Sequence, residues 1–563
     1  MFGELKTSYE FGPFRVDPRE RQLIRNGEIV PLRPKVFDIL LLLVENSGHV
    51  LTKDDVMKHV WSNTAVEEGN ISRTISTLRN ALGERPDEHR YIETIPWRGY
   101  RFVANVKEVC VEETVKGIES IAVLPFVNVN ADAATEYLVD GITDNLIRTL
   151  AQSRNLRVTS RNSAFRYRGR DVDAQSVGRE LKVQALLLGR VSQTSDSLSI
   201  SVELIDTRDD RHLWGAQYIR PTDDLLATCE TITSKIQEQL RLDRPVRDAK
   251  LSRHSHDAHV LYLKGRYHFN KLTWDGVQKA KEYLQQATQL DPNYALAYAA
   301  LGDCHNYVAE RAEAKAAVLK ALELDDALGE AHASLGFFRF LYEWDFAGAE
   351  SSLKRSFALN PNYAEAHHWY AIYLANLGRH EEAEREAKRA VELDPLSLLM
   401  NLTAALNFYL AREHDRAIEQ LQRVFELESN FLAAHSVMGN VLVQKGFLAE
   451  AIAEFEKVLE LIKGVAGVEL SVKAVMAHAY ARFGKRSDAL KLVEEVTGAG
   501  TALAYLIAGV YAALEEVDVA FGWLDKAYAQ HDLQLVSLKV DPSLDGLRSD
   551  PRFNRLMNAV GIP

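Results

Sequence analysis

A repeat of about 34 residues constrains the fold of this chain more than any other feature. The motif Leu-Asp-Pro-Asn-Tyr at residues 290–294 returns in related forms that begin at residues 324, 359, 393 and 427. Within each unit, small and apolar residues follow helical i, i+3 and i+4 spacing on both sides of a central break. Two helices joined by a turn are therefore expected in every unit. Because degenerate units surround Leu261, Tyr480 and Tyr511, we predict an α-solenoid of about eight helix pairs.

Alanine or glycine occupies the positions where the two helices of a pair are expected to meet. Five such residues are each followed about 12 positions later by alanine: Gly302 and Ala314, Gly336 and Ala349, Ala371 and Ala383, Ala405 and Ala417, and Gly439 and Ala451. Side chains this small allow two helix backbones to approach closely. Over residues 258–530 the pattern resembles the tetratricopeptide repeat family.

This resemblance implies a binding module rather than a centre of chemistry. Repeats of the family stack into a superhelix whose concave surface holds a protein or a peptide. Residues 256–563 would form the module, closed at its end by an amphipathic helix over residues 550–556. The aromatic residues within the repeats are expected to pack between helices rather than to form a ligand cage; they include Tyr298, Trp369, Tyr370, Tyr373 and Tyr409.

The first hundred residues predict short strands, then three helices, then a hairpin. Strand-like pieces at residues 11–16, 22–24 and 29–32 are separated by prolines and by the hairpin signal Asn26-Gly27. Pro34 opens the first helix, and Thr52 caps a second that runs to Trp61. The third helix is predicted from about Val66 to Gly83. Residues 91–103 form two strands around a turn with Arg98 at its tip.

The third helix has an unusual outer face. Ile71, Ile75, Leu78 and Leu82 form one apolar stripe, and the opposite side carries Asn70, Arg73, Ser76, Thr77 and Asn80. No carboxylate lies between Ile71 and Gly83. Hydrogen-bonding groups and a guanidinium without nearby acids suit a helix that lies in the major groove of DNA.

Helices of this order followed by a basic hairpin indicate a winged helix-turn-helix. Residues 8–106 resemble the OmpR-type, or trans_reg_C, DNA-binding domain through residues 32–35, 51–56, 60–61 and 92–102. The resemblance implies a bacterial, sequence-specific transcription regulator of the kind used in phosphorelay signal transduction, with residues 1–107 as the DNA-binding domain. The DNA-binding residues would be Asn70, Arg73, Ser76, Thr77, Asn80, Arg98 and Arg101.

The third helix carries fewer cations than the family usually has. Arg73 and Arg79 are its only basic residues, and Arg79 lies toward the side of the helix. We therefore expect weak binding by one copy, a shallow salt dependence, and tighter binding by a homodimer on paired half-sites. The alternative is a winged helix that serves protein contacts.

Residues 118–245 predict an α/β module. Strands are expected at residues 121–126, 156–159, 185–191, 198–205 and 212–219, and helices at 137–152 and 174–181. The stretch resembles the TolB N-terminal-like, FlgO-type domain that lies between winged helices and repeats in CadC-like regulators. We interpret Asp140 and Asp144 as carboxylates near a helix start rather than metal ligands. A basic loop at Arg161, Arg166, Arg168 and Arg170 is either a solvated face or an anion contact.

Composition excludes several other classes. The 563 residues exceed what one core holds, so the fold class is multidomain, combining α+β and all-α parts. Cys110, Cys229 and Cys304 have no zinc or disulfide spacing, and His254, His256 and His259 read as linker histidines. Nucleotide-loop, serine-hydrolase and zinc-protease motifs are lacking, so we expect no enzyme, cofactor or metal. Neither an apolar run of roughly 20 residues nor a leader peptide is seen, which predicts a cytoplasmic protein without a membrane partner.

The net charge of −12 arises mainly beyond residue 247, where about 33 Lys and Arg oppose about 43 Asp and Glu. An acidic repeat surface fits either of two functions. The first is a transcriptional regulator that binds double-stranded DNA and receives input when its repeats bind a protein or peptide. The alternative is a tetratricopeptide scaffold or adaptor whose winged helix serves protein contacts. A cyclase-linked enzyme is a third class, which no catalytic carboxylate pair supports.

Overall fold

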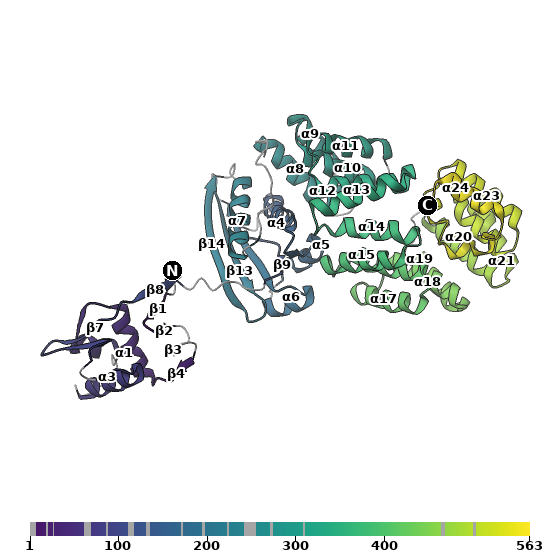
Figure 1. Cartoon of the computed structure of the whole chain (residues 1–563). Helices are drawn as coiled ribbons and strands as arrows, with labels where there is room; N and C mark the ends of the chain where they lie inside the picture. Colours follow the sequence, from purple (N-terminus) through teal and green to yellow (C-terminus); the bar gives the residue numbers. More distant parts are fainter. Residues whose placement is uncertain are drawn as a thin grey trace. The chain divides into compact units, whose positions relative to one another are not determined.

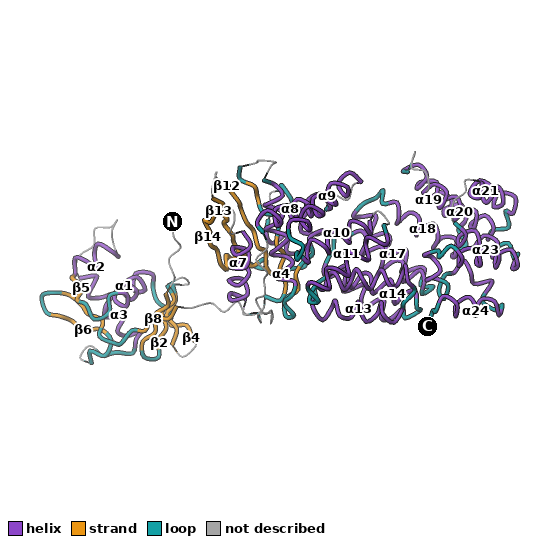
Figure 2. Tube along the Cα trace, turned by 90° about the horizontal axis from the view of Figure 1, so that it is seen from above, coloured by secondary structure: helices purple, strands orange, loops and turns teal. Residues whose placement is uncertain are grey.

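The computed structural model describes residues 7–18, 21–25, 28–60, 69–85, 88–110, 118–130, 135–170, 173–193, 197–221, 225–240, 242, 255–270, 274–307, 310–462, 468–498 and 503–563. The chain forms two compact units, Met1–Thr114 and Val115–Pro563 (Figure 1). All described strands lie before residue 222, and the described chain from residue 225 onward is helical (Figure 2).

The first unit combines three helices with two antiparallel sheets. One sheet has the strand order β4-β3-β2-β1-β8, formed by β1 (Thr7–Phe11), β2 (Phe14–Asp17), β3 (Gln22–Arg25), β4 (Glu28–Val30) and β8 (Lys107–Cys110). The other has the order β5-β7-β6, formed by β5 (Val50–Thr52), β6 (Ile92–Ile95) and β7 (Gly99–Phe102). The helices are α1 (Pro34–Glu45), α2 (Lys53–Val60) and α3 (Gly69–Leu82).

The predicted strand over residues 11–16 was wrong in one respect, because it is two strands. Gly12 adopts φ +53° between them, a left-handed conformation that glycine tolerates, and the chain reverses there. The hairpin expected at Asn26-Gly27 is confirmed by the pairing of Arg25 with Glu28. Trp61, Val66, Asn26 and Gly27 themselves lie outside the described residues.

The start of α2 follows its sequence signal. Thr52 Oγ1 accepts the Asp55 N–H at 3.1 Å, and the Asp55 carboxylate accepts the Thr52 N–H at the same distance. Such a reciprocal pair satisfies backbone donors that the helix leaves without partners. The hydrogen bonds from Thr52 also lower the pKa of Asp55.

The middle segment begins the second unit with a mixed sheet. The strand order is β11-β9-β12-β13-β14, and β10 also pairs with β12. The strands are β9 (Ser120–Val123), β10 (Val127–Asn128), β11 (Arg157–Val158), β12 (Ala185–Gln193), β13 (Ser197–Asp206) and β14 (Arg211–Pro221). The helices are α4 (Glu136–Ala151), α5 (Arg161–Ala164), the 3-10 turn η1 (Phe165–Tyr167), α6 (Ala174–Leu181) and α7 (Leu225–Leu240). The predicted α/β class is confirmed, whereas α5 and α7 were not foreseen.

The interpretation of Asp140 and Asp144 as carboxylates near a helix start was wrong. Helix α4 begins at Glu136, so both residues lie beyond its first turn. Arg168 donates to the Asp140 carboxylate, and Arg161 Nε lies 2.7 Å from Asp144 Oδ1. The two arginines of the predicted basic loop therefore bind the two carboxylates of α4.

Eight helix pairs make up the described solenoid, which confirms the predicted number. The pairs are α8 (His256–Phe269) with α9 (Trp274–Leu290), α10 (Ala295–Tyr307) with α11 (Arg311–Leu324), α12 (Gly329–Phe338) with α13 (Phe346–Leu359), α14 (Ala364–Asn376) with α15 (His380–Leu393), α16 (Leu398–Leu410) with α17 (His414–Leu427), α18 (Leu432–Lys445) with α19 (Leu448–Leu461), α20 (Val468–Arg482) with α21 (Arg486–Gly498), and α22 (Ala504–Ala513) with α23 (Val517–Ala529).

Small residues lie where the sequence placed them. A side chain at Gly302 would come within 2.7 Å of Val318, and one at Gly439 within 2.4 Å of Phe455. The five alanine partners are buried. Tyr370, Tyr373 and Tyr409 are buried as well, and Trp369 stacks on Phe337 at 5.1 Å, so these aromatic residues pack between helices as expected.

The C-terminal segment does more than close the end of the solenoid. It contains η4 (Leu533–Ser537), η5 (Pro542–Leu547) and α24 (Pro551–Val560). Helix α24 packs beside α23, where Arg552 Nη1 donates to Asp518 at 2.8 Å. The chain ahead of it reaches back to the third and fourth pairs: His531 Nε2 lies 2.9 Å from the Tyr342 carbonyl, and Ser537 Oγ donates to Asn376 Oδ1 at 2.6 Å.

The middle segment and the repeats share an interface built on the turns of the repeat motif. Asn362 Nδ2 donates to the carbonyls of Ala151, Ser153 and Leu156 at 2.8–3.1 Å. Arg157 Nη1 donates to the Glu392 carbonyl at 2.8 Å. These bonds join the two parts into one unit.

Candidate nucleic-acid interface

Helix α3 presents its predicted polar row to solvent. Ile71, Ile75, Leu78 and Leu82 are buried and pack in the core with α1 and α2. Asn70, Arg73, Ser76, Thr77 and Asn80 are all exposed on the other side. Thr77 Oγ1 donates to the Arg73 carbonyl at 3.0 Å, which leaves the hydroxyl oxygen able to accept. The structure therefore places these five predicted residues on one exposed face.

The hairpin of β6 and β7 carries two exposed side chains at its tip. Ile95 pairs with Gly99, and the Arg98 N–H donates to the Ile95 carbonyl at 3.1 Å. Trp97 adopts φ +67° and is fully exposed, and Arg98 next to it is exposed. Tryptophan side chains are highly buried on average. The sequence analysis did not select Trp97, although the predicted strand-turn-strand pattern of residues 91–103 contains it.

Arg79 fixes the hairpin to the helix. Its Nη2 donates to the Ile92 carbonyl and to Thr94 Oγ1, both at 2.9 Å. Ser72 and Tyr100 make a second link, with their hydroxyl oxygens 3.3 Å apart. Because Arg79 is engaged in this way, Arg73 is the guanidinium of α3 that faces outward.

A buried carboxylate holds the start of the hairpin. Glu84, just beyond α3, is 2% exposed and accepts the N–H groups of Tyr91 at 2.9 Å and Ile92 at 3.3 Å. The hairpin also requires glycine at position 99. Gly99 adopts φ +154°, and a Cβ there would lie 1.9 Å from the Leu51 carbonyl oxygen. Contacts inside the core therefore fix the position of the hairpin relative to α3.

Arg101 lies apart from the other predicted residues. It pairs across the hairpin with Glu93, with Nη1 3.8 Å from Glu93 Oε2. Successive side chains of a strand point to opposite faces, and Tyr100 and Thr94 occupy the face that contacts α3. Arg101 therefore projects from the other face.

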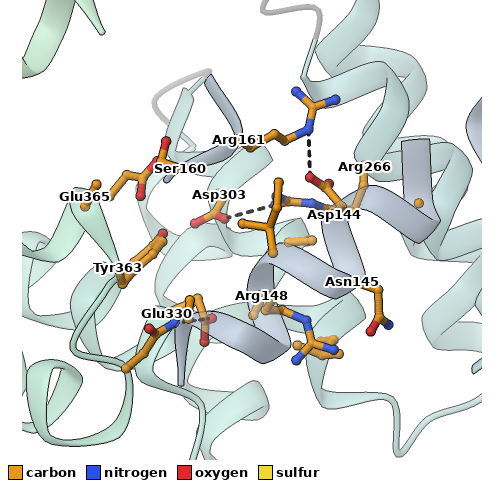
Figure 3. Close-up of a pocket in the computed structure, with 18 of the residues that line it drawn as sticks. Asp144, Asn145, Arg148, Ser160, Arg161, Arg266, Asp303, Glu330, Tyr363 and Glu365 are labelled. Atoms are coloured by element: carbon orange, nitrogen blue, oxygen red, sulfur yellow. Dashed lines mark hydrogen bonds and ion pairs between the residues drawn. The ribbon is translucent and has the colours of Figure 1, made fainter. Parts of the chain in front are cut away.

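The second unit contains a charged cavity between the middle segment and the repeats. Its volume is about 160 Å³, and Figure 3 shows acids and arginines from both parts around it. Arg266 of α8 lies 4.0 Å from Asp303 of α10, and Asn360 donates to Glu330 of α12 at 3.1 Å. Arg161 and Asp144 form the third interaction (Figure 3).

Burial sets the protonation of two of these acids. It raises the pKa of Asp303 to about 6, although Arg266 and a hydrogen bond from Ser334 oppose the shift. It raises the pKa of Glu365 to about 7, and the charge of Asp394 adds to the effect. The cavity therefore holds carboxyl groups that titrate near neutral pH.

Three family models match separate parts of the chain. Residues 27–102 match the model described as "Transcriptional regulatory protein, C terminal". Residues 117–235, for which the sequence suggested a TolB N-terminal-like domain, match "HilA/YgeH-like transcriptional regulator, second domain". Residues 340–406 match "Tetratricopeptide repeat". The chain has the domain organisation of CadC-like regulators.

Curated relatives agree with this CadC-like organisation. Transcriptional regulator HilA of Salmonella typhimurium is 24% identical over 489 residues, which cover 84% of this chain and 85% of HilA. Transcriptional activator CadC of Escherichia coli is 33% identical over 96 residues, covering 17% of this chain and 19% of CadC. Putative adenylate cyclase 3 of Rhizobium meliloti is 33% identical over 189 residues, or 32% of each chain.

The regulator interpretation is therefore supported over the adaptor alternative, because winged helix, regulator domain and repeats occur together. Within the described residues, no helix is both long and apolar enough to cross a bilayer.

Proposed function

We propose that this protein is a transcriptional regulator that binds double-stranded DNA with α3 and the tip of the β6–β7 hairpin. The observation that carries the proposal is the exposed face of α3, which has hydrogen-bonding side chains and Arg73 but no carboxylate. DNA repels carboxylates and attracts guanidinium groups, and its base edges both donate and accept hydrogen bonds. A helix whose outer face only contacts water would not need to exclude carboxylates from that face.

The position of each predicted residue suggests which part of the DNA it would contact. Asn70, Arg73, Ser76, Thr77 and Asn80 would face the major groove, where amides and guanidinium groups read base edges and hydroxyls bind phosphates. Arg98 and Trp97 would meet the adjacent minor groove or backbone. Arg101 lies on the opposite face of the hairpin. It would either support the hairpin through its cross-strand pair with Glu93 or bind a DNA phosphate.

The remaining parts of the proposal concern partners and setting. Residues 1–107 would bind DNA, residues 118–245 would brace the repeats, and residues 256–563 would bind a protein or peptide as the input. Two copies would bind paired half-sites, since one α3 offers a single outward guanidinium. The protein would act in the cytoplasm without catalysis, cofactor or metal, and its place in phosphorelay signal transduction stays a prediction.

Footprinting on the DNA upstream of the protein's own gene tests the proposal. The full chain is expected to protect two half-sites about one helical turn apart or a multiple of it, roughly 10 base pairs per turn. Protection should weaken as salt rises. The variant with Arg73→Ala and Arg98→Ala should not protect the site. If the full chain protects no DNA at low salt, the proposal fails and the repeats become the functional part.

A further inference from the structure

A second cavity lies within the second unit, among the last four helix pairs and the C-terminal segment. Its volume is about 370 Å³, within the range of roughly 300–1,000 Å³ that small-molecule sites occupy. One wall is a single face of α20, which carries Val468, Ser471, Val472 and Val475. Asn440 and Gln444, one turn apart on α18, form part of the facing wall.

The C-terminal segment forms the remaining side and is fixed in place. Tyr505 of α22 donates its hydroxyl to Asp541 at 2.9 Å, and the Ser543 N–H donates to the same carboxylate at 2.8 Å. Arg412, after α16, donates to Asp545 at 2.8 Å. A side chain at Gly509 would come within 3.2 Å of Ser543 Oγ, so helix and segment are in direct contact. The cavity is therefore preformed rather than a gap between mobile parts.

The lining is almost without charge. Asp541 is the one acidic residue of the described lining, and its carboxylate is already bound by Tyr505 and Ser543. Lys and Arg do not occur among the lining residues that the structure describes. Apolar atoms supply most of the surface, and serine and amide groups supply neutral polar points.

His478 of α20 adds no charge to this lining. Its side chain is buried, with 8% of the residue exposed. Burial lowers the pKa of His478 to about 4, so the ring is neutral at physiological pH.

We propose that this cavity binds a small, uncharged, mainly apolar organic molecule with a single hydrogen-bonding group for the serine and amide side chains of the lining. An anionic ligand would find no cation among the described lining residues and would be repelled by Asp541. A cationic ligand would find the one carboxylate of the described lining already engaged. This site is independent of the proposed DNA binding.

Two fluorescent probes with one skeleton test the proposal on the full-length protein. N-phenyl-1-naphthylamine is uncharged, apolar and carries one N–H group, and 8-anilinonaphthalene-1-sulfonate adds a sulfonate to the same skeleton. The neutral probe should bind with one site per chain and gain fluorescence. The sulfonate should bind about tenfold more weakly or not at all.

Variants locate the binding. Val468 lines the cavity and is 46% exposed, so Val468→Trp can add bulk to the lining without repacking the core and should abolish binding. Val519 of α23 is 41% exposed and is not among the lining residues, so Val519→Trp makes the same change elsewhere and should leave binding unchanged. Failure of the neutral probe to bind, equal binding of the sulfonate, or equal effects of the two tryptophan variants would overturn the proposal.

Discussion

Asp394, in the turn that follows the fourth helix pair, accepts a hydrogen bond from the hydroxyl of Ser163 in the middle segment. The same carboxylate accepts Asn162 Nδ2 at 3.1 Å, and the Leu396 N–H donates to Ser163 Oγ at 2.8 Å. Asp394 is fully buried. The Asp-Pro motif that marks the repeat in the sequence therefore also attaches the middle segment to the solenoid.

Asp394→Ala should loosen this attachment. The change leaves Asn162 and Ser163 without their acceptor inside the interface, at a cost of about 2–3 kcal/mol. Urea denaturation of the full chain measures the loss of stability in the second unit. Asp325→Ala is the matched control, because Asp325 holds the equivalent turn position and accepts the Ala327 N–H at 3.0 Å. Equal effects of the two changes would contradict a role at the interface.

Glu365→Gln should stabilise the protein above neutral pH and have little effect at pH 5. The folded pKa of Glu365 is raised to about 7, above the ordinary value of 4.5. Between these two values the folded state holds a proton that the unfolded state has lost, so this group lowers stability as pH rises through the window. The amide carries no such charge. The gain is on the order of 3 kcal/mol at most, since one pKa unit corresponds to about 1.4 kcal/mol.

Thermal unfolding of the two proteins at pH 5 and pH 8.5 measures this effect. The difference in Tm should appear at the higher pH. A difference of the same size at both values would mean that the glutamine acts by packing rather than by removing the charge.

Gly99→Ala should disrupt the hairpin. The new Cβ would meet the Leu51 carbonyl oxygen at 1.9 Å, a backbone contact that no rotamer relieves. The expected loss is on the order of 3 kcal/mol, seen as a lower urea midpoint for the first unit. Gly48→Ala is the control, because Gly48 also has positive φ (+83°) but nothing lies within 4 Å of its Cβ position. Its cost should be about 1 kcal/mol.

Arg79→Ala should weaken DNA binding by a different route from Arg73→Ala. Arg79 holds the hairpin to α3 through Ile92 and Thr94, so its loss should lower affinity and leave the salt dependence nearly unchanged. Arg73→Ala should reduce the slope of log K against log salt by about 1 if its guanidinium binds a phosphate. Titrations of both variants at four salt concentrations distinguish positioning from contact. A reduced slope for Arg79→Ala would contradict the structural role assigned here.

Periodicity and local signals predicted most of the fold. The 34-residue repeat gave eight helix pairs, and the apolar stripe of α3 placed Ile71 and Leu82 inward and Arg73 outward. Thr52 marked the start of α2 because a capping hydroxyl acts within three residues. Each of these features depends on neighbours that are close in the sequence.

Contacts between distant residues were beyond the reach of such patterns. The pairs of Asp394 with Ser163 and of Ser537 with Asn376 join residues 231 and 161 positions apart. Nothing in the Asp-Pro motif distinguishes a turn that ends a helix from one that also binds a neighbouring domain. For the same reason the sequence left Arg161 and Arg168 as either a solvated face or an anion contact, although they bind Asp144 and Asp140. Trp97 was overlooked because exposure at a hairpin tip depends on which face of the hairpin is covered.

The most direct test of the central claim measures DNA affinity of the full chain against salt concentration. The wild type is compared with Arg73→Ala/Arg98→Ala and with the control Arg25→Ala/Arg90→Ala. The control removes the same charge from two exposed arginines that lie over the rings of Phe14 and Tyr91. We predict that the first variant loses about 100-fold or more in affinity and about 2 in salt slope, while the control stays close to the wild type. Equal losses in the two variants, or none in the first, would contradict DNA binding through α3 and the hairpin tip.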